Sequence, residues 1–126
     1  MSGFAFDSNI IIDTLRGFPQ ARTEIERAVL RGGRVWISRV VWIEVMSKER
    51  GETLRNIEIF LNGFSIDEID LQVAAHAAAL RRERARLKFA DSVILASAQV
   101  HHRILVTRNT KDFPAEMPGI RVPYTL

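Results

Sequence analysis

The chain has 126 residues, of which 47% are hydrophobic and 26% charged, a balance typical of an ordered globular protein rather than a disordered chain. Its length suits one domain, which we predict to span residues 1–126, and the excess of 18 basic over 15 acidic residues, a net charge of +3, permits a polyanionic partner. The absence of Cys excludes disulfide scaffolds, zinc–thiolate sites, iron–sulfur clusters and cysteine nucleophiles, and it fits a reducing, cytoplasmic environment.

Strand and helix patterns alternate along the chain. In chain order we expect a strand at residues 3–6, helices at 10–15 and 19–30, a strand at 34–37, helices at 39–49 and 53–61, a strand at 64–69, helices at 71–87 and 93–101, and strands at 104–107 and 120–122. The residues expected to cap or end these helices are Ser8 with Asn9, Gly32 with Gly33, Ser38, Asn62 with Gly63, Asp70, and Asp91 or Ser92. Short apolar strands separated by helices predict an α/β fold, with a mostly parallel sheet covered by helices on both faces.

Nothing in the sequence predicts attachment to a membrane. The apolar start of the chain is interrupted by Asp7 and lacks the basic region and the cleavage site of a signal peptide. No uncharged apolar stretch approaches the roughly 18 residues that a membrane-spanning helix needs. We therefore expect a protein without a membrane partner.

Three acidic residues stand alone in apolar segments. Asp7 is the only charged residue among residues 1–12, Glu44 the only one among 40–47, and Asp91 the only one among 89–100. Burying an ionised carboxylate without a partner costs several kcal/mol, so such groups are normally paired, hydrogen-bonded or bound to a metal ion. The three positions are therefore candidates for a functional site.

The predicted topology offers these acids a common place. Asp7 follows the first strand, Asp112 follows the strand at residues 104–107, and Glu44 lies in the helix after the second strand. Ligands of open parallel sheets bind beyond the carboxyl ends of the strands, where Asp7 and Asp112 are expected and which Glu44 can reach. Asp91, in the first turn of its predicted helix, joins them only if that helix begins on the same side, and the sequence leaves this open.

Each candidate also has a simpler explanation. Asp7 and Asp91 are suited to capping helices, and Asp112 to a solvated turn. Glu44, in the middle of a helix, caps nothing, so its alternative is a buried ion pair with Arg39 or Lys48. The other conspicuous acids are interpreted as exposed in the case of Asp67 and Glu68, and as a helix cap in the case of Asp70.

Four segments of the sequence resemble the motifs of PIN domains, in the order that the family has them. They are FAFDSNIII at residues 4–12, SRVVWIEV at 38–45, LKFADSVILA at 87–96 and VTRNTKDF at 106–113. Asp7, Glu44 and Asp91 match the first three acidic positions of the family. The closing segment holds both Asn109 and Asp112, and we favour Asp112 as the fourth acid.

This resemblance, which extends to the VapC-type toxins and their FitB-like branch, implies a fold, an activity and partners. The fold is a three-layer sandwich, and the activity is metal-dependent endoribonuclease cleavage. The partners are RNA, a VapB-like antitoxin encoded nearby and, in the family, a second copy in a homodimer. The implied metal ligands and catalytic residues are Asp7, Glu44, Asp91 and Asp112.

The chemistry of these residues agrees with such a site. Hard divalent cations prefer oxygen ligands, so carboxylates without Cys suit Mg²⁺ or Mn²⁺, which activate water for attack on a phosphodiester. Ser8 is expected to hydrogen-bond one of the ligand carboxylates, with Thr107 and Asn109 as further support. Without metal, clustered carboxylates repel one another and their protonated forms are favoured.

Basic residues close to the third and fourth motifs are candidates for contacts to the RNA backbone. A solvated helix end is the simpler explanation for most of them, and contacts of this kind add affinity without reading sequence. The candidates are Arg81, Arg82, Arg84, Arg86, Lys88 and Arg108.

Other functions remain as alternatives at this point. One is a catalytically weak PIN-like module that binds RNA or protein, and another is a phosphotransfer receiver domain, which also has an Asp at the end of a strand. A receiver has two acids near its first strand and a Lys on a late one, and neither is evident here. His101 and His102, a conceivable acid–base pair, are interpreted as polar residues at a helix end.

Overall fold

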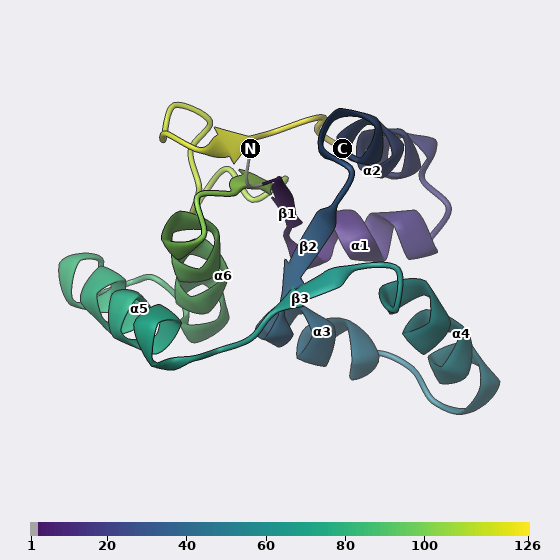
Figure 1. Cartoon of the computed structure of the whole chain (residues 1–126), viewed down its shortest axis with the longest axis horizontal. Helices are drawn as coiled ribbons and strands as arrows, with labels where there is room; N and C mark the ends of the chain where they lie inside the picture. The colour runs from purple at the N-terminus through teal and green to yellow at the C-terminus, as the bar shows by residue number, and fades with distance from the viewer. Residues whose placement is uncertain (1–2) are drawn as a thin grey trace.

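The computed structural model describes residues 3–126 and contains one five-stranded sheet, in the order β3-β2-β1-β4-β5 (Figure 1). Every neighbouring pair of strands is parallel, which confirms the predicted α/β fold with a parallel sheet. The strands are β1 (Phe4–Phe6), β2 (Val35–Ser38), β3 (Ser65–Asp67), β4 (Ile104–Val106) and β5 (Ile120–Arg121). All five occur where the sequence predicts a strand; four are shorter than predicted, and β2 is shifted by one residue so that it includes Ser38.

Helices cover both faces of this sheet. In Figure 1, α5 and α6 lie on one side of the strands, and α1, α2 and α4 lie on the other, which gives three layers. The helices are α1 (Ser8–Leu15), α2 (Pro19–Gly32), α3 (Arg39–Met46), α4 (Gly51–Leu61), α5 (Leu71–Glu83) and α6 (Phe89–Val100). None of the helices within residues 3–126 is long and apolar enough to span a bilayer.

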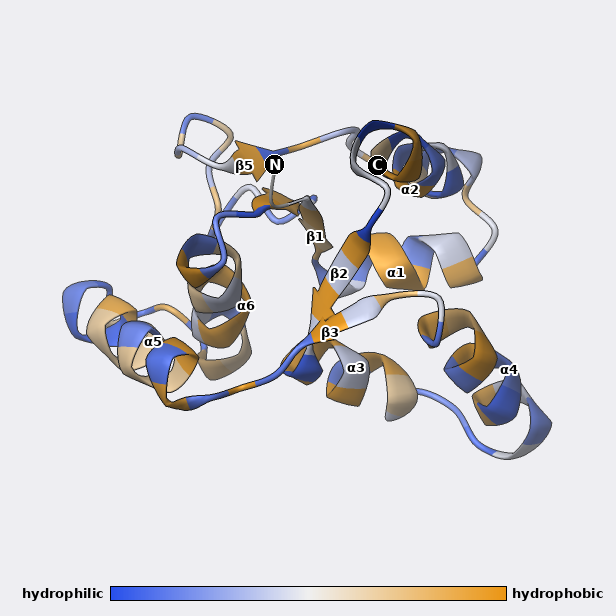
Figure 2. Ribbon diagram, viewed as in Figure 1, coloured by the Kyte–Doolittle hydropathy of each residue, from blue (hydrophilic) through white to orange (hydrophobic). Residues whose placement is uncertain are grey.

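The core lies between the sheet and the inward faces of the helices. Figure 2 shows hydrophobic residues concentrated on the strands and on the helix sides that face them. The aromatic ring of Phe6 in β1 packs edge-on against Phe64, which in turn packs edge-on against Phe60 of α4. These contacts fix α4 against the sheet and leave the carboxyl ends of the strands to the polar residues that follow them.

Helices α1, α4 and α6 begin before the predicted residues, and α1 and α6 also have N-caps other than the predicted ones. The N-cap of α1 is Asp7, not Ser8 or Asn9, and its carboxylate accepts a hydrogen bond from the first backbone N–H of the helix. The N-cap of α6 is Lys88, so Asp91 lies inside the first helical turn and does not cap the helix. The side chain of Asp91 is therefore free for another role.

Helix α5 ends at Glu83, four residues before the predicted end at Leu87. The side chain of Leu87 is buried in the core, and the chain leaves the helix before it reaches this position. The backbone N–H of Arg84 still bonds to the helix, while the Arg81 guanidinium donates to the carbonyl of Leu87 and holds the connection to α6. The predicted caps Ser38 and Asp70 are confirmed by their bonds to Val40 and Val73.

Candidate active site

Asp7 lies directly after β1, and its side chain is 4% exposed. Its Oδ1 accepts from the backbone N–H of Ser8 at 2.7 Å, which caps α1, and its Oδ2 accepts from the hydroxyl of Thr107 at 2.7 Å. Burial above all, and the negative charge of Glu44 to a lesser extent, raise the pKa of the Asp7 carboxyl. Capping and site formation are therefore compatible, because the cap uses one carboxylate oxygen and leaves the other facing Thr107.

Glu44 is brought to Asp7 from helix α3. The hydroxyl of Ser8 donates a short hydrogen bond to its Oε1, which links the first motif to the second. Neither ion pair suggested as an alternative for Glu44 forms: the guanidinium of Arg39 binds Glu68 instead, and Lys48 makes no salt bridge with any of the residues 3–126. No cation among the described residues is paired with Glu44, and its charge is felt by both Asp7 and Asp91.

Asp91 joins the same group of acids, which answers the question that the sequence left open. Helix α6 runs back to the start of β4, so its first turn lies at the carboxyl ends of the strands. Burial, followed by the charges of Asp7 and Asp112, a hydrogen bond with Asp112 and the charge of Glu44, raises the pKa of Asp91 to about 6. The carboxylates are thus close enough to oppose one another's ionisation.

The closing segment after β4 completes the arrangement. The Thr107 hydroxyl that donates to Asp7 also accepts the backbone N–H of Asn109 at 2.9 Å. The Asn109 side chain in turn donates to Oδ2 of Asp112 at 3.0 Å. Asp112 therefore supplies the negative charge next to Asp91, while Asn109 links it by hydrogen bonds to Thr107 and to the buried Asp7.

The other buried acids differ from Asp7 in having a cationic partner. Asp13 binds Arg108, Glu24 binds Arg121 and Asp67 binds Arg103, each through two guanidinium nitrogens. Within residues 3–126, none of Asp7, Glu44, Asp91 and Asp112 forms a salt bridge. The four predicted site acids are thus electrostatically coupled to each other and lack the counter-charge that the other buried acids have.

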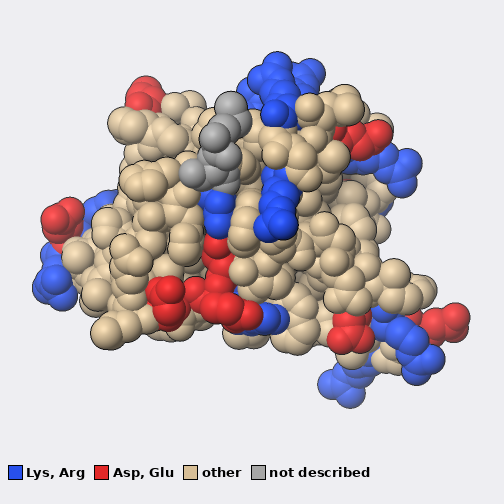
Figure 3. All heavy atoms as spheres, in the orientation of Figure 1, with Lys and Arg blue, Asp and Glu red and all other residues tan. Residues whose placement is uncertain are grey.

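Asp67 corrects one prediction from the sequence. It was expected to be exposed, but only 4% of its surface is accessible, because the Arg103 guanidinium covers it and also lies 3.6 Å from the ring centre of Trp36. Acidic side chains do gather at the surface where β3 ends (Figure 3). The acids that follow one another there have structural partners: Asp67 has Arg103, Glu68 has Arg39 and Asp70 caps α5.

Across residues 3–126, no group of three or more acidic or histidine side chains is arranged as a ready-made metal site. The donor chemistry of the four acids nevertheless fits a hard divalent cation, since all four offer carboxylate oxygens and none is neutralised by Lys or Arg. Burial first, and then repulsion between the carboxylates, raises the pKa values of Asp7 and Asp91, and a cation between them would offset the repulsion.

The basic residues predicted to contact RNA fall into three groups. Arg84 is half-buried, and its Nη2 donates to the backbone carbonyl of Asp112 at 2.6 Å. Arg108 has its guanidinium committed to Asp13 at 2.6 and 3.0 Å. The remaining predicted residues, Arg81, Arg82, Arg86 and Lys88, are exposed around the end of α5 and the loop to α6.

Sequence reasoning overlooked Lys111 and Tyr124. Lys111 lines a hollow together with Arg84 and Arg86, and its position beside Asp112 in the sequence is the signal that could have identified it. The Tyr124 hydroxyl donates to Asp13 at 2.8 Å, and no local pattern in the sequence announces this contact between distant segments.

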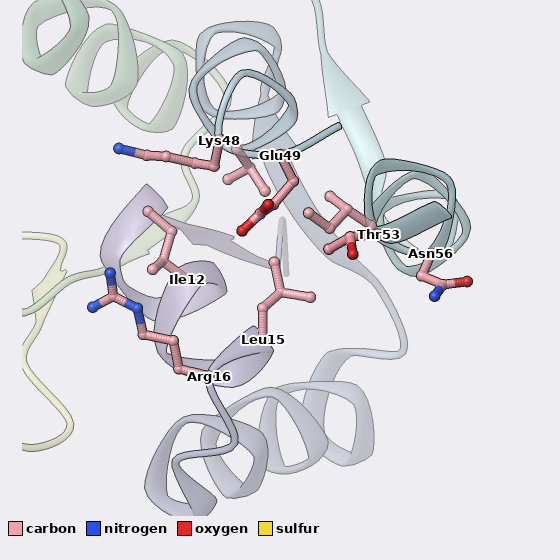
Figure 4. Close-up of a pocket in the computed structure, with 9 residues that line it drawn as sticks. Ile12, Leu15, Arg16, Lys48, Glu49, Thr53 and Asn56 are labelled. Carbon is pink, nitrogen blue, oxygen red and sulfur yellow. The ribbon is translucent and has the colours of Figure 1, made fainter. Parts of the chain in front are cut away.

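A separate groove of about 430 Å³ runs between α1, the end of α3 and α4 (Figure 4). In Figure 4 the charged ends of Arg16 and Lys48 lie at one side of the groove and Asn56 at the other. None of the four site acids lines it, so the groove is distinct from the acid cluster. Its lining residues are Ile12, Leu15, Arg16, Val45, Lys48, Glu49, Thr53, Asn56 and Ile57.

Comparison with known proteins agrees with this architecture. The chain is 29% identical to Ribonuclease VapC19 of Mycobacterium tuberculosis over 122 residues, which cover 94% of this chain and 97% of that protein. It is similar to the structure of a toxin–antitoxin complex from Klebsiella pneumoniae, with a TM-score of 0.86 and 37% identity over 97% of this chain and 98% of that chain. The DNA-bound VapBC structure from Salmonella typhimurium gives a TM-score of 0.79 and 29% identity over 96% of each chain.

The family itself is identified by a match that spans most of the sequence. The profile of the PIN domain matches residues 4–115, a range that contains all four acids and the hydrogen-bonded residues that connect them. This protein therefore belongs to the PIN domain family.

Proposed function

We propose that this PIN domain is a VapC-like toxin, an endoribonuclease that hydrolyses RNA phosphodiester bonds with Mg²⁺ or Mn²⁺ in the cytoplasm. The observation that carries the proposal is the contrast between two kinds of acid. Asp13, Glu24 and Asp67 are each neutralised by an Arg, whereas the four coupled acids Asp7, Glu44, Asp91 and Asp112 form no salt bridge with any Lys or Arg of residues 3–126. Carboxylates that are held together without a basic side chain beside them are suited to binding a metal cation. The similarity to a named ribonuclease supports the same conclusion.

Asp7, Glu44 and Asp91 are the residues that would hold the ion, with Asp112 added from the closing segment. The Ser8 hydroxyl orients Glu44, and the Thr107 hydroxyl orients Asp7. When bound, Mg²⁺ or Mn²⁺ supplies a Lewis acid that polarises the phosphate and lowers the pKa of water. The chain then needs no nucleophile of its own.

Protonation of Asp91 sets the pH range in which the site can bind a cation. Its pKa of about 6 means that the carboxyl is mostly ionised at neutral pH and mostly protonated well below pH 6. A proton and a metal ion compete for the same oxygens, so cation binding is expected to weaken as the pH falls through this value.

The proposal is tested with purified protein, freed of any antitoxin, and a single-stranded RNA. We expect cleavage in Mg²⁺ or Mn²⁺, no cleavage in excess chelator, and recovery when the metal is restored. Metal addition should also raise the melting temperature, since it binds the folded state. Cleavage that persists in chelator would contradict the metal-dependent mechanism, and RNA binding without cleavage would favour a PIN-like RNA-binding module.

We also propose that a VapB-like antitoxin neutralises the activity by laying a segment into the groove of Figure 4. Two solved structures similar to this chain are a toxin–antitoxin complex and DNA-bound VapBC. The groove offers apolar contacts from Ile12 and Leu15, with Arg16 and Lys48 at its side. Such a lining suits an amphipathic segment that presents apolar side chains and an acidic residue.

Leu15→Glu is expected to weaken the antitoxin complex at least tenfold, because it introduces a charge into an apolar contact, a loss of about 1.4 kcal/mol or more. Leu15 is 39% exposed, so the fold should tolerate the change. The measurement is copurification and titration with the protein encoded by the neighbouring gene. Leu30→Glu, at a position 88% exposed on α2 and outside the groove, is the matched control. Equal affinity of both variants would exclude this groove as the docking surface.

A further inference from the structure

A basic hollow of about 340 Å³ lies beside the acid cluster. It is formed by the connection from α5 to α6 and by the closing segment after β4. Its lining residues are Arg84, Ala85, Arg86, Leu87, Lys111 and Asp112. The Lys111 and Arg86 side chains are exposed, and neither forms a salt bridge with any of the residues 3–126. The hollow therefore carries three cationic side chains whose charge no carboxylate neutralises by contact.

Arg84 is the fixed member of this group. Its Nη2 donates to the Asp112 carbonyl at 2.6 Å, while its Nη1 is buried and has no hydrogen-bond acceptor among residues 3–126. A guanidinium that has lost water without gaining a carboxylate is destabilised, and an anion placed close to it offsets that cost. The other buried Arg–acid pairs of the molecule show how such charges are normally compensated here.

Asp112 connects the basic hollow to the acid cluster. Its carboxylate accepts from Asn109 and acts on Asp91, while its backbone carbonyl accepts from Arg84. One residue thus separates a site of negative charge from a site of positive charge. A substrate with repeated phosphates along a flexible strand can occupy both sites at once.

We infer that the basic hollow binds a backbone phosphate of the RNA strand next to the bond that is cleaved. This inference rests on the proposed function and adds to it a second contact point, with Lys111 and Arg86 as ligands around the fixed Arg84. Guanidinium and ammonium groups are suited to phosphate oxygens, and they read no base identity. The hollow therefore positions the strand and leaves its sequence unread.

The test compares the double variant R86A/K111A with the wild-type chain by fluorescence anisotropy, using a labelled single-stranded RNA in chelator. Both altered side chains are exposed, so the fold should be retained. We expect binding to weaken on the order of tenfold, as for loss of charge-assisted hydrogen bonds. The negative slope of log affinity against log salt concentration should become less steep by about 0.7 for one lost phosphate contact. The matched control R22A/R55A removes the same charge from exposed positions on α2 and α4 and should change affinity little.

Two further arms separate the possible outcomes. Inorganic phosphate should raise the melting temperature of wild type more than that of R86A/K111A, because it offers the same oxygens to the hollow. A selective rise together with unchanged RNA affinity would assign the hollow to free anions and overturn the inference. In metal, the double variant should have a raised KM and an unchanged kcat. If the wild-type chain cleaves RNA and R86A/K111A binds RNA as tightly as wild type, the phosphate-binding role of the hollow is refuted and the nuclease activity stands. If the wild-type chain does not cleave RNA but R86A/K111A still binds RNA more weakly, the nuclease activity is refuted and the phosphate-binding role of the hollow stands.

Discussion

Asp91→Asn is expected to reduce the RNA cleavage rate by more than about 100-fold, because altering residues that merely orient a metal ligand already costs roughly 10- to 100-fold. Asn keeps the size of the side chain and its ability to bond with Asp112, and it removes one negative charge and one anionic oxygen. The measurement is single-turnover cleavage of one RNA at saturating Mg²⁺ or Mn²⁺. Cleavage at the wild-type rate would remove Asp91 from the proposed site.

The same variant carries its own control for folding. The pKa of Asp91 is raised from 3.8 to about 6, so its ionisation opposes folding, and the stability it contributes is present at low pH and lost as pH rises through 6. In chelator, Asp91→Asn should therefore melt a few degrees above the wild-type chain at pH 8, and the difference should vanish toward pH 4. Added metal should favour wild type. A variant that melts lower at every pH would make its loss of activity uninterpretable, and Asp7→Asn would then replace it.

Local patterns in the sequence were sufficient to predict the α/β fold and to single out Asp7, Glu44 and Asp91 as candidates for a site. The strands are short and apolar because both faces are covered, and a lone charge inside such a segment, as at Asp7 and Asp91, marks a position where burial needs a reason. The placement of Asp91 could not be predicted, because the side on which α6 begins depends on how the α5–α6 connection returns to the sheet. Leu87, buried four residues after the end of α5, determines that connection through tertiary packing.

Salt bridges between residues far apart in the sequence could not be predicted from it. Asp67 was interpreted as exposed, yet Arg103, 36 residues further on, buries it. Arg108 was interpreted as an RNA contact because it lies within the fourth motif, yet Asp13, 95 residues earlier, binds it. Acid–Arg partners are set by strand order and register, so any of the Arg residues could have matched any acid before the topology was known.

Arg108→Ala is expected to destabilise the protein by about 3–5 kcal/mol, the usual cost of leaving one partner of a buried ion pair alone. Asp13 is 1% exposed, and its carboxylate accepts from Arg108 at 2.6 and 3.0 Å. Without Arg108, the one bond left to this carboxylate from residues 3–126 is the 2.8 Å bond from Tyr124. For a chain of this length the melting temperature should fall by roughly 10–20 °C, measured by calorimetry or circular dichroism at pH 7.

Two comparisons distinguish the stability lost by leaving a buried charge unpaired from the stability lost by removing any Arg side chain. Arg39→Ala removes a guanidinium with the same two-nitrogen contact, to Glu68, but that pair is exposed to solvent that screens its charges, so its loss should change the melting temperature much less. Adding Asp13→Asn to Arg108→Ala should recover part of the lost stability, because it removes the charge that has been left without a partner. If the double variant is less stable than Arg108→Ala, the Asp13 charge is not the source of the cost. Arg108 is the residue before Asn109, whose side chain donates to Asp112. Recovered stability without recovered cleavage would therefore show that the Arg108–Asp13 pair also positions the closing segment.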